Sequence, residues 1–201
     1  MKSIYDFIVE PVGKRYNNEI KVNEKQLILN TSIENWKVIN RIAIVIETPV
    51  AYSTKIKKGD LVVVHQNVFR RFYNMKGKQQ NSRSWFKENQ YFCNISQIYL
   101  YKQKDKWQTI LERCFVKPIL DTNVLTLDKE KKLVGILKYG NSSLKAAGIN
   151  PGDLIGFTPN SEWDFIIDNE RLYCMQSNDI VIKYEYQGNE IEYNPSWAKS
   201  S

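Results

Sequence analysis

The chain has 201 residues, a formal net charge of +7 and a hydrophobic content of 42%. This composition supports a packed core, and it excludes an intrinsically disordered chain. No apolar run approaches the roughly 20 residues that a membrane span requires. Because residues 1–6 lead almost directly into a predicted strand, we expect no signal peptide and a cytoplasmic protein without a membrane partner.

Short apolar runs rich in β-branched and aromatic residues follow one another along the chain, which is typical of an all-β fold. In chain order these runs cover residues 7–12, 27–29, 42–46, 61–64, 91–93, 98–101, 113–119, 133–137, 154–157, 172–175 and 180–183. The clearest helical signal is residues 142–148, which predict one capped turn ending at Gly148. A polar stretch at residues 103–106 separates two halves, and residues 187–193 are suited to a final hairpin.

The two halves repeat each other in order. Three matched pairs carry the repeat: Val9 with Val116, Gly59 with Gly152, and Cys93 with Cys174. Their offsets in the numbering are 107 (116 − 9), 93 (152 − 59) and 81 (174 − 93). The falling offsets place insertions of about 14 and about 12 residues in the first half (107 − 93 and 93 − 81). We therefore predict domains at residues 1–104 and 105–186, followed by a hairpin or tail at residues 187–201.

The first insertion, residues 13–30, is polar until it reaches an apolar triplet, Leu27, Ile28 and Leu29. A polar segment with a short apolar anchor is suited to docking in a partner's groove. The alternative is that the triplet forms one more core strand. The two interpretations are compatible if the edge of that strand is also the docking site.

The second insertion is basic and aromatic. Residues 61–87 include no acid, and basic side chains are interleaved there with aromatic ones. Grooves for single-stranded nucleic acid combine these residue types. The candidate contacts are Arg70, Arg71, Lys76, Lys78, Arg83 and Trp85. The alternative is an exposed hairpin whose charges maintain solubility.

Residues suited to catalysis are sparse. His65 is the only histidine, and no neighbouring segment offers it both a nucleophile and an orienting acid, so we interpret it as a partly buried structural residue. The three cysteines fit neither a zinc pattern nor a disulfide scaffold, and they predict buried thiols. The acids at residues 162–170 suit a solvated hairpin better than a cation site. We expect no enzymatic activity, no cofactor and no metal.

Laid end to end, each half resembles the domain of GroES-type co-chaperonins. The second half is the nearer match, through Ile-Asn-Pro-Gly-Asp-Leu-Ile-Gly-Phe at residues 149–157, Asp-Asn-Glu at 168–170 and Asp-Ile-Val at 179–181. In the first half, residues 6–12, 27–29, 42–46, 56–64 and 91–101 fall in the order of the family's segments. The resemblance implies two tandem small, partly open GroES-like β-barrels, a layout similar to that of the chloroplast tandem co-chaperonin.

The resemblance also implies a function. A protein of this kind would be a homo-oligomer that caps an ATP-dependent, GroEL-type chaperonin ring and assists protein folding. The chaperonin-binding role would fall on Leu27, Ile28 and Leu29, and the basic insertion at residues 69–86 would occupy the position of the roof hairpin. The second half has only residues 121–132 where the docking loop belongs, with Val124 and Leu125 as a poor triplet.

Two other functions stay open on the sequence. One is a structural or assembly protein, such as a viral one, that uses the fold as an interaction module. The other is a β-barrel that binds single-stranded nucleic acid through the basic insertion.

Overall fold

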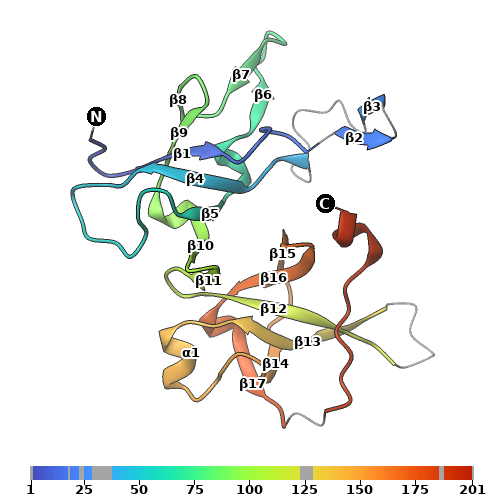
Figure 1. Ribbon diagram of the computed structural model, residues 1–201. Coiled ribbons are helices and arrows are strands. Elements are labelled where there is room, and N and C mark those ends of the chain that lie inside the picture. Colours follow the sequence, from blue (N-terminus) through green and yellow to red (C-terminus); the bar gives the residue numbers. More distant parts are fainter. Residues whose placement is uncertain are drawn as a thin grey trace. The chain divides into compact units, whose positions relative to one another are not determined.

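The computed structural model describes residues 2–17, 19–22, 25–28, 38–122, 129–185 and 188–200. The chain is mostly β, with two antiparallel sheet regions and one short α-helix, so the all-β prediction is confirmed at this level (Figure 1). It divides into two compact units, Met1–Trp107 and Gln108–Ser201, which are described separately below. In the described part of the chain, no helix is both long enough and apolar enough to cross a membrane.

The first unit is built on a seven-stranded sheet with the strand order β11-β10-β5-β4-β1-β9-β8. Its strands are β1 (Phe7–Pro11), β4 (Ile42–Glu47), β5 (Leu61–Val64), β8 (Trp85–Lys87), β9 (Gln90–Cys93), β10 (Ile98–Gln103) and β11 (Lys106–Thr109), whose last two residues are assigned to the second unit. Two antiparallel hairpins form separate two-stranded sheets: β2 (Glu19–Val22) with β3 (Lys25–Ile28), and β6 (Arg71–Tyr73) with β7 (Gln79–Asn81). Short 3-10 turns, η2 (Gln66–Val68) and η3 (Ile95–Gln97), follow β5 and β9.

The second unit has a six-stranded sheet with the order β15-β16-β12-β13-β14-β17. Its elements are β12 (Arg113–Leu120), β13 (Glu130–Tyr139), α1 (Ser142–Ala146), β14 (Leu154–Phe157), β15 (Trp163–Ile167), β16 (Glu170–Gln176), η4 (Ser177–Asp179), β17 (Ile180–Lys183) and η5 (Ser196–Ser200). In the residues that the structure describes, the end strands of neither sheet pair with each other, so neither sheet closes into a barrel.

Apart from β11, the two sheets share one strand order, and their central strands share one register. Pro11 pairs with Ala43 in the first unit, and Pro118 pairs with Gly135 in the second. On the other side of the same strands, Val9 faces Tyr91 and Val116 faces Tyr173. The offsets between equivalent positions are therefore 107 (116 − 9), 92 (135 − 43) and 82 (173 − 91).

The predicted equivalence of Cys93 and Cys174 is wrong by one position. The register offset of 82 makes Met175 the counterpart of Cys93 (93 + 82), and Met175 faces Cys114 as Cys93 faces Phe7. The prediction that the thiols are buried is confirmed for Cys93, Cys114 and Cys174. They belong to the packed sheets and form no disulfide.

The Gly-Asp corners have the same geometry in both units. Gly59 and Gly152 adopt φ values of +90° and +97°, a region that side chains disfavour. Each glycine amide donates to the strand alongside, Gly59 to the carbonyl of Val45 and Gly152 to that of Leu137, both at 2.8 Å. The following aspartate accepts the amide of the residue three positions earlier, which closes the turn.

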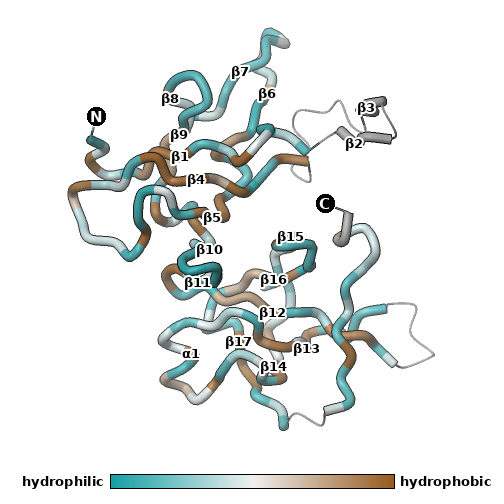
Figure 2. The backbone as a smooth tube through the Cα atoms, in the orientation of Figure 1, coloured by the Kyte–Doolittle hydropathy of each residue, from teal (hydrophilic) through white to brown (hydrophobic). Residues whose placement is uncertain are grey.

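Apolar residues from these strands form the core of each unit. Phe7, Val9 and Leu100 are fully buried in the first unit, and Phe115 and Leu172 are fully buried in the second. In Figure 2 the hydrophobic residues gather in central strands such as β4 and β5, whereas the hairpin of β6 and β7 is mostly hydrophilic. The core therefore lies in the sheets, and the inserted hairpin contributes little to it.

Two local predictions have different outcomes. The predicted helical turn is confirmed as α1, whose N-cap Asn141 accepts the amide of Leu144 at 3.0 Å. The predicted final hairpin is wrong, because residues 191–193 hydrogen-bond to β12. The amide of Leu120 donates to Ile191, and that of Tyr193 donates to Pro118. β16 pairs with β12 only from Arg113 to Val116, so the last segment takes up the edge beyond.

Candidate functional site

The first unit differs from the second by two inserted segments. The segment between β1 and β4, which we call the arm (residues 13–40), is longer than its counterpart, as the fall in the numbering offset between the units from 107 to 92 across it shows.

The segment after β5 contains the hairpin of β6 and β7, which we call the basic hairpin (residues 69–83). The offset falls again between β5 and β9, from 93 (156 − 63) to 82 (173 − 91), so this segment is longer too. These segments carry every site residue that the sequence predicts except Trp85, which lies in β8.

The arm begins and ends at a hydrogen-bonded neck. Tyr16 and Ile39 form an antiparallel bridge, and the amide of Asn40 donates to the carbonyl of Arg15 at 3.1 Å. Asn40 is only 4% exposed, and its Nδ2 donates to the carbonyls of Val12 and Lys14 at 2.7 and 2.9 Å. This buried amide therefore joins the two chain segments where the arm leaves the sheet.

Beyond the neck, the arm forms the hairpin of β2 and β3, in which Ile20 pairs with Leu27. Leu27 and Ile28 of the predicted docking triplet lie in β3, and Leu29 lies outside the described residues. The alternative interpretation, that the triplet forms one more core strand, does not agree with the backbone. β3 pairs with β2 and is not part of the seven-stranded sheet.

Arg15 joins the neck of the arm to the basic hairpin. Its Nε donates to the carbonyl of Phe69, its Nη2 donates to the carbonyl of Arg70 at 3.0 Å, and its Nη1 donates to Oδ1 of Asn81 at 2.7 Å. The guanidinium also lies over the ring of Tyr91, 5.0 Å from its centroid. One side chain thus holds both flanks of the basic hairpin against β9.

A second contact repeats this pairing of arginine with tyrosine. The amide of Arg71 donates to the hydroxyl of Tyr16 at 2.8 Å, and the Arg71 guanidinium lies 5.6 Å from the centre of the same ring. Burial lowers the pKa of Arg15 from its usual value, and the charge of Arg71 acts in the same direction. Both guanidinium groups remain charged, because arginine does not deprotonate in proteins.

A cavity of about 410 Å³, open to solvent, lies beside these contacts. It is lined by Arg15, Arg71, Gln79, Gln80, Asn81, Trp85, Glu88, Asn89 and Tyr91. Two of the predicted contacts, Arg71 and Trp85, therefore meet in one place. Arg15 and Tyr91 were missed, because Arg15 lies in the other insertion and no local pattern connects it to the basic hairpin.

The other predicted contacts lie outside this lining. Lys76 and Lys78 are exposed at the turn between β6 and β7, and Arg83 is exposed between β7 and β8. The Nε of Arg70 is buried and has no hydrogen-bond partner in the described part of the chain. The structure thus separates the predicted set into two cavity residues and a surrounding group of positive charges.

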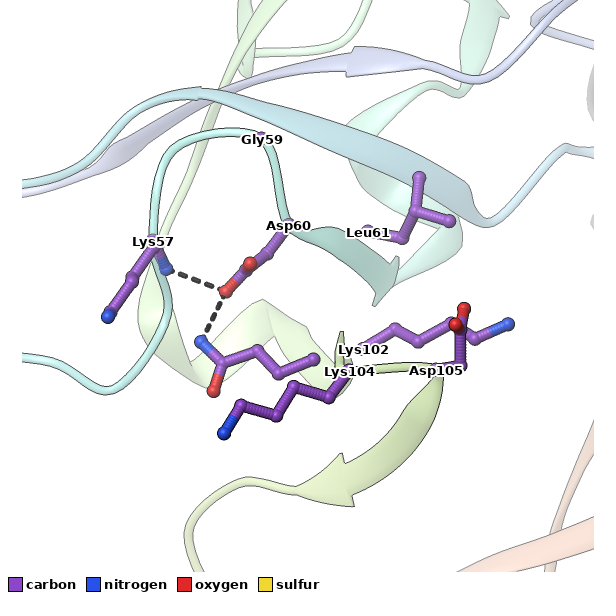
Figure 3. Close-up of a pocket in the computed structure, with 8 residues that line it drawn as sticks. Lys57, Gly59, Asp60, Leu61, Lys102, Lys104 and Asp105 are labelled. Carbon is purple, nitrogen blue, oxygen red and sulfur yellow. Dashed lines mark hydrogen bonds between the residues drawn. The ribbon is translucent and has the colours of Figure 1, made fainter.

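A second cavity, of about 450 Å³, lies beside the Gly-Asp corner of the first unit (Figure 3). Oδ2 of Asp60 accepts the amide of Lys57 at 2.8 Å and Nε2 of Gln103 at 2.6 Å, as the dashed lines show. In the second unit, Asp153 accepts the amide of Asn150 in the same way. Because the same corner occurs in both units, we assign the carboxylate of Asp60 a structural role.

Several of the residues considered for catalysis or metal binding have structural partners. His65 is half-buried and caps η2, where its Nδ1 accepts the amide of Asn67 at 3.1 Å. Burial raises the pKa of the Cys93 and Cys114 thiols. Asp164 pairs with Arg171 at 2.9 Å. Across the ranges that the structure describes, no group of three His, Cys, Asp or Glu side chains is placed to hold a metal ion.

The chain matches no protein-family model, and no curated protein matches it either.

Proposed function

We propose that the chain is a co-chaperonin-like protein whose arm docks in an apolar groove of an ATP-dependent chaperonin ring. The observation that carries this proposal is the arm itself. The two units share one strand order, yet only the first has a long segment between its first two sheet strands. In the second unit the corresponding strands, β12 and β13, are joined by residues 121–129.

The neck supports a docking role for the arm. A segment whose ends are fixed by Asn40 and Arg15 keeps its position on the sheet whether or not its distal part is bound. The resemblance to GroES-type domains places the docking contact on Leu27, Ile28 and Leu29. On this proposal each sheet is a partly open barrel of that family, the protein works as a cytoplasmic homo-oligomer, and it has no enzymatic activity.

Replacing Leu27, Ile28 and Leu29 with serine tests the proposal. Burying each of these side chains against a partner contributes about 1.5–3 kcal/mol, so we expect the triple variant to bind at least about 100-fold more weakly. The measurement is biolayer interferometry on an immobilised GroEL-type chaperonin, with and without ATP. Wild-type protein should bind only in the presence of nucleotide.

The matched control is the double variant Val124→Ser/Leu125→Ser, which removes the corresponding apolar residues of the second unit. It should bind as wild type does, and circular dichroism should show that all three proteins are folded. If the triple variant binds with wild-type affinity, or if wild-type protein shows no nucleotide-dependent binding, the proposed function is wrong.

A further inference from the structure

The cavity between the neck of the arm and the basic hairpin has a positive charge without a matching negative one. Arg15 uses its hydrogen bonds on the carbonyls of Phe69 and Arg70 and on Asn81, but it keeps its charge. Arg71 lies on the face of Tyr16, and within the described residues its guanidinium donates no hydrogen bond and pairs with no carboxylate. The donors of Arg71 are therefore available to an anion.

The acid in the lining does not neutralise this charge. Glu88 is exposed, and in the part of the chain that the structure describes it forms no ion pair with either arginine. A guanidinium with free donors beside a second, fixed positive charge is the arrangement that binds phosphate, because the planar donors match the phosphate oxygens. The cavity thus has one strong position for a phosphate group, at Arg71.

Trp85 gives the same cavity a stacking surface. This residue is 43% exposed although it lies in a strand of the sheet. The Nε1 of the indole donates to the carbonyl of Glu88 at 3.2 Å. This hydrogen bond holds the ring by its edge and does not involve the ring faces. A held aromatic ring of this kind is a platform for an unpaired base, because every base has a π-face.

Side-chain amides complete the lining, contributed by Gln79, Gln80, Asn81 and Asn89. Amides donate and accept hydrogen bonds, so they can pair with the polar edge of a base. The volume of about 410 Å³ falls within the range of about 300–1,000 Å³ that is typical of small-ligand pockets. The cavity is therefore large enough for one nucleotide of an unpaired strand.

The surroundings extend the positive charge along a path. Lys76, Lys78 and Arg83 are exposed on the basic hairpin, and Lys87 follows Trp85 in β8. No acid occurs from residue 61 to residue 87, and the whole chain carries a net charge of +7. Such a field attracts a polyanion and raises its rate of association.

We propose that this cavity binds single-stranded nucleic acid, with one phosphate on Arg71 and one base stacked on Trp85. The flanking phosphates contact the lysines and Arg83 of the basic hairpin. The site requires a single strand, because a base can stack on Trp85 only when it is not paired and stacked within a duplex. It is distinct from Leu27, Ile28 and Leu29, so chaperonin docking and strand binding can each fail without the other.

The test is fluorescence anisotropy with labelled oligo(dT) and oligo(U) of about 12 nucleotides, a length within the site sizes of single-strand binders. At about 50 mM salt, full-length protein should bind at least one of them, and the affinity should fall as salt rises. A preference for one oligonucleotide distinguishes DNA from RNA as the ligand. A duplex of the same length should bind more weakly.

Two matched pairs of variants distinguish base stacking and phosphate contact from non-specific attraction of a polyanion by the net positive charge. Trp85→Leu should weaken binding about 5- to 150-fold, whereas Trp85→Phe retains a stacking ring and should lose much less. Arg71→Gln should weaken binding and reduce the slope of log affinity against log salt by about 0.7, the contribution of one phosphate contact on a single strand. Lys58→Gln removes the same charge from an exposed position outside the cavity lining and should change neither.

Circular dichroism shows whether each variant is folded, and the comparison of Arg71→Gln with Lys58→Gln keeps the test decisive if Trp85→Leu is not. The proposal is overturned if neither oligonucleotide binds. It is equally overturned if Trp85→Phe and Trp85→Leu bind alike, or if Arg71→Gln behaves as Lys58→Gln does. Either of those results would mean that the chain attracts polyanions through its net charge alone.

Discussion

Arg15→Met tests how strongly the side chain of Arg15 joins the arm to the basic hairpin. Methionine keeps the apolar stem over Tyr91 but removes the guanidinium, which donates to the carbonyls of Phe69 and Arg70 and to Oδ1 of Asn81. The site of Asn81 is exposed, so water can replace that bond. The two carbonyls are only partly accessible, and each loses a charge-assisted bond.

A lost bond that leaves a shielded acceptor without a partner costs about 1–3 kcal/mol. Only the carbonyl of Phe69 loses its partner, because that of Arg70 keeps the bond from the amide of Ser82 at 3.1 Å. We therefore expect a loss of about 1–3 kcal/mol in the free energy of unfolding of the first unit. The matched control is Arg71→Met in the same hairpin. The guanidinium of Arg71 contributes a contact with the face of Tyr16, which is worth about 0.5–1 kcal/mol at an exposed site.

Hydrogen exchange measured by mass spectrometry reads the two units separately. We expect Arg15→Met to increase exchange at the amides of Asn17 and Asn40 in the neck, while the amide of Leu137 in the second unit is unchanged. Denaturant unfolding gives the corresponding free energy. A loss no larger than that of Arg71→Met, or an unchanged neck, would refute the role assigned to Arg15.

Two further predictions use the repeat as an internal control. Gly135→Ala should destabilise the second unit by about 1–3 kcal/mol, because a Cβ there would lie 2.5 Å from Cγ1 of Val116 and 2.6 Å from the carbonyl oxygen of Lys117. The counterpart in the first unit, Ala43, already carries a Cβ. If thermal unfolding shows that Gly135→Ala is as stable as wild type, the packing described here is wrong. The backbone amide of Asn150 and the ammonium of Lys183 lower the pKa of Asp153. The ionised carboxylate of Asp153 therefore stabilises the fold above the unfolded pKa of about 3.9, and this stabilisation is lost as pH falls through the lower pKa of the folded state. Wild-type protein should therefore lose more stability than Asp153→Asn between about pH 5 and pH 2, and parallel unfolding curves for the two proteins would oppose this assignment.

The parts of the fold that the sequence predicts are those encoded within a few neighbouring residues. The Gly-Asp corners are visible because Gly59 supplies the positive φ and Asp60 closes a turn of only four residues. The α1 turn is visible for the same reason, since Asn141 caps it and Gly148 ends it. Local turn chemistry is readable without knowledge of the tertiary structure.

The errors concern which segments come together. Matching the cysteines by residue type gave an offset of 81, whereas strand register pairs Cys114 with Met175 and requires 82. The turn-forming residues at 187–190 gave no indication that the free edge of β12 would take up residues 191–193. Side-chain identity and turn propensity do not specify which strand edge is free.

The candidate site shows the same division. Arg71 and Trp85 were predicted because they lie in one basic and aromatic stretch. The side chain of Arg15 forms its hydrogen bonds with residues at least 54 positions away, and Tyr91 belongs to a core strand. No sequence pattern links these four positions, because the cavity exists only where the two insertions meet.

Native mass spectrometry of the chain with a GroEL-type chaperonin, with and without ATP, tests the central proposal most directly. We predict a homo-oligomer of the chain alone and a nucleotide-dependent complex of that oligomer with the chaperonin ring. The Leu27, Ile28 and Leu29 serine variant should keep the oligomer and lose the complex. A chain that forms no complex with the ring under either condition would contradict the proposed function.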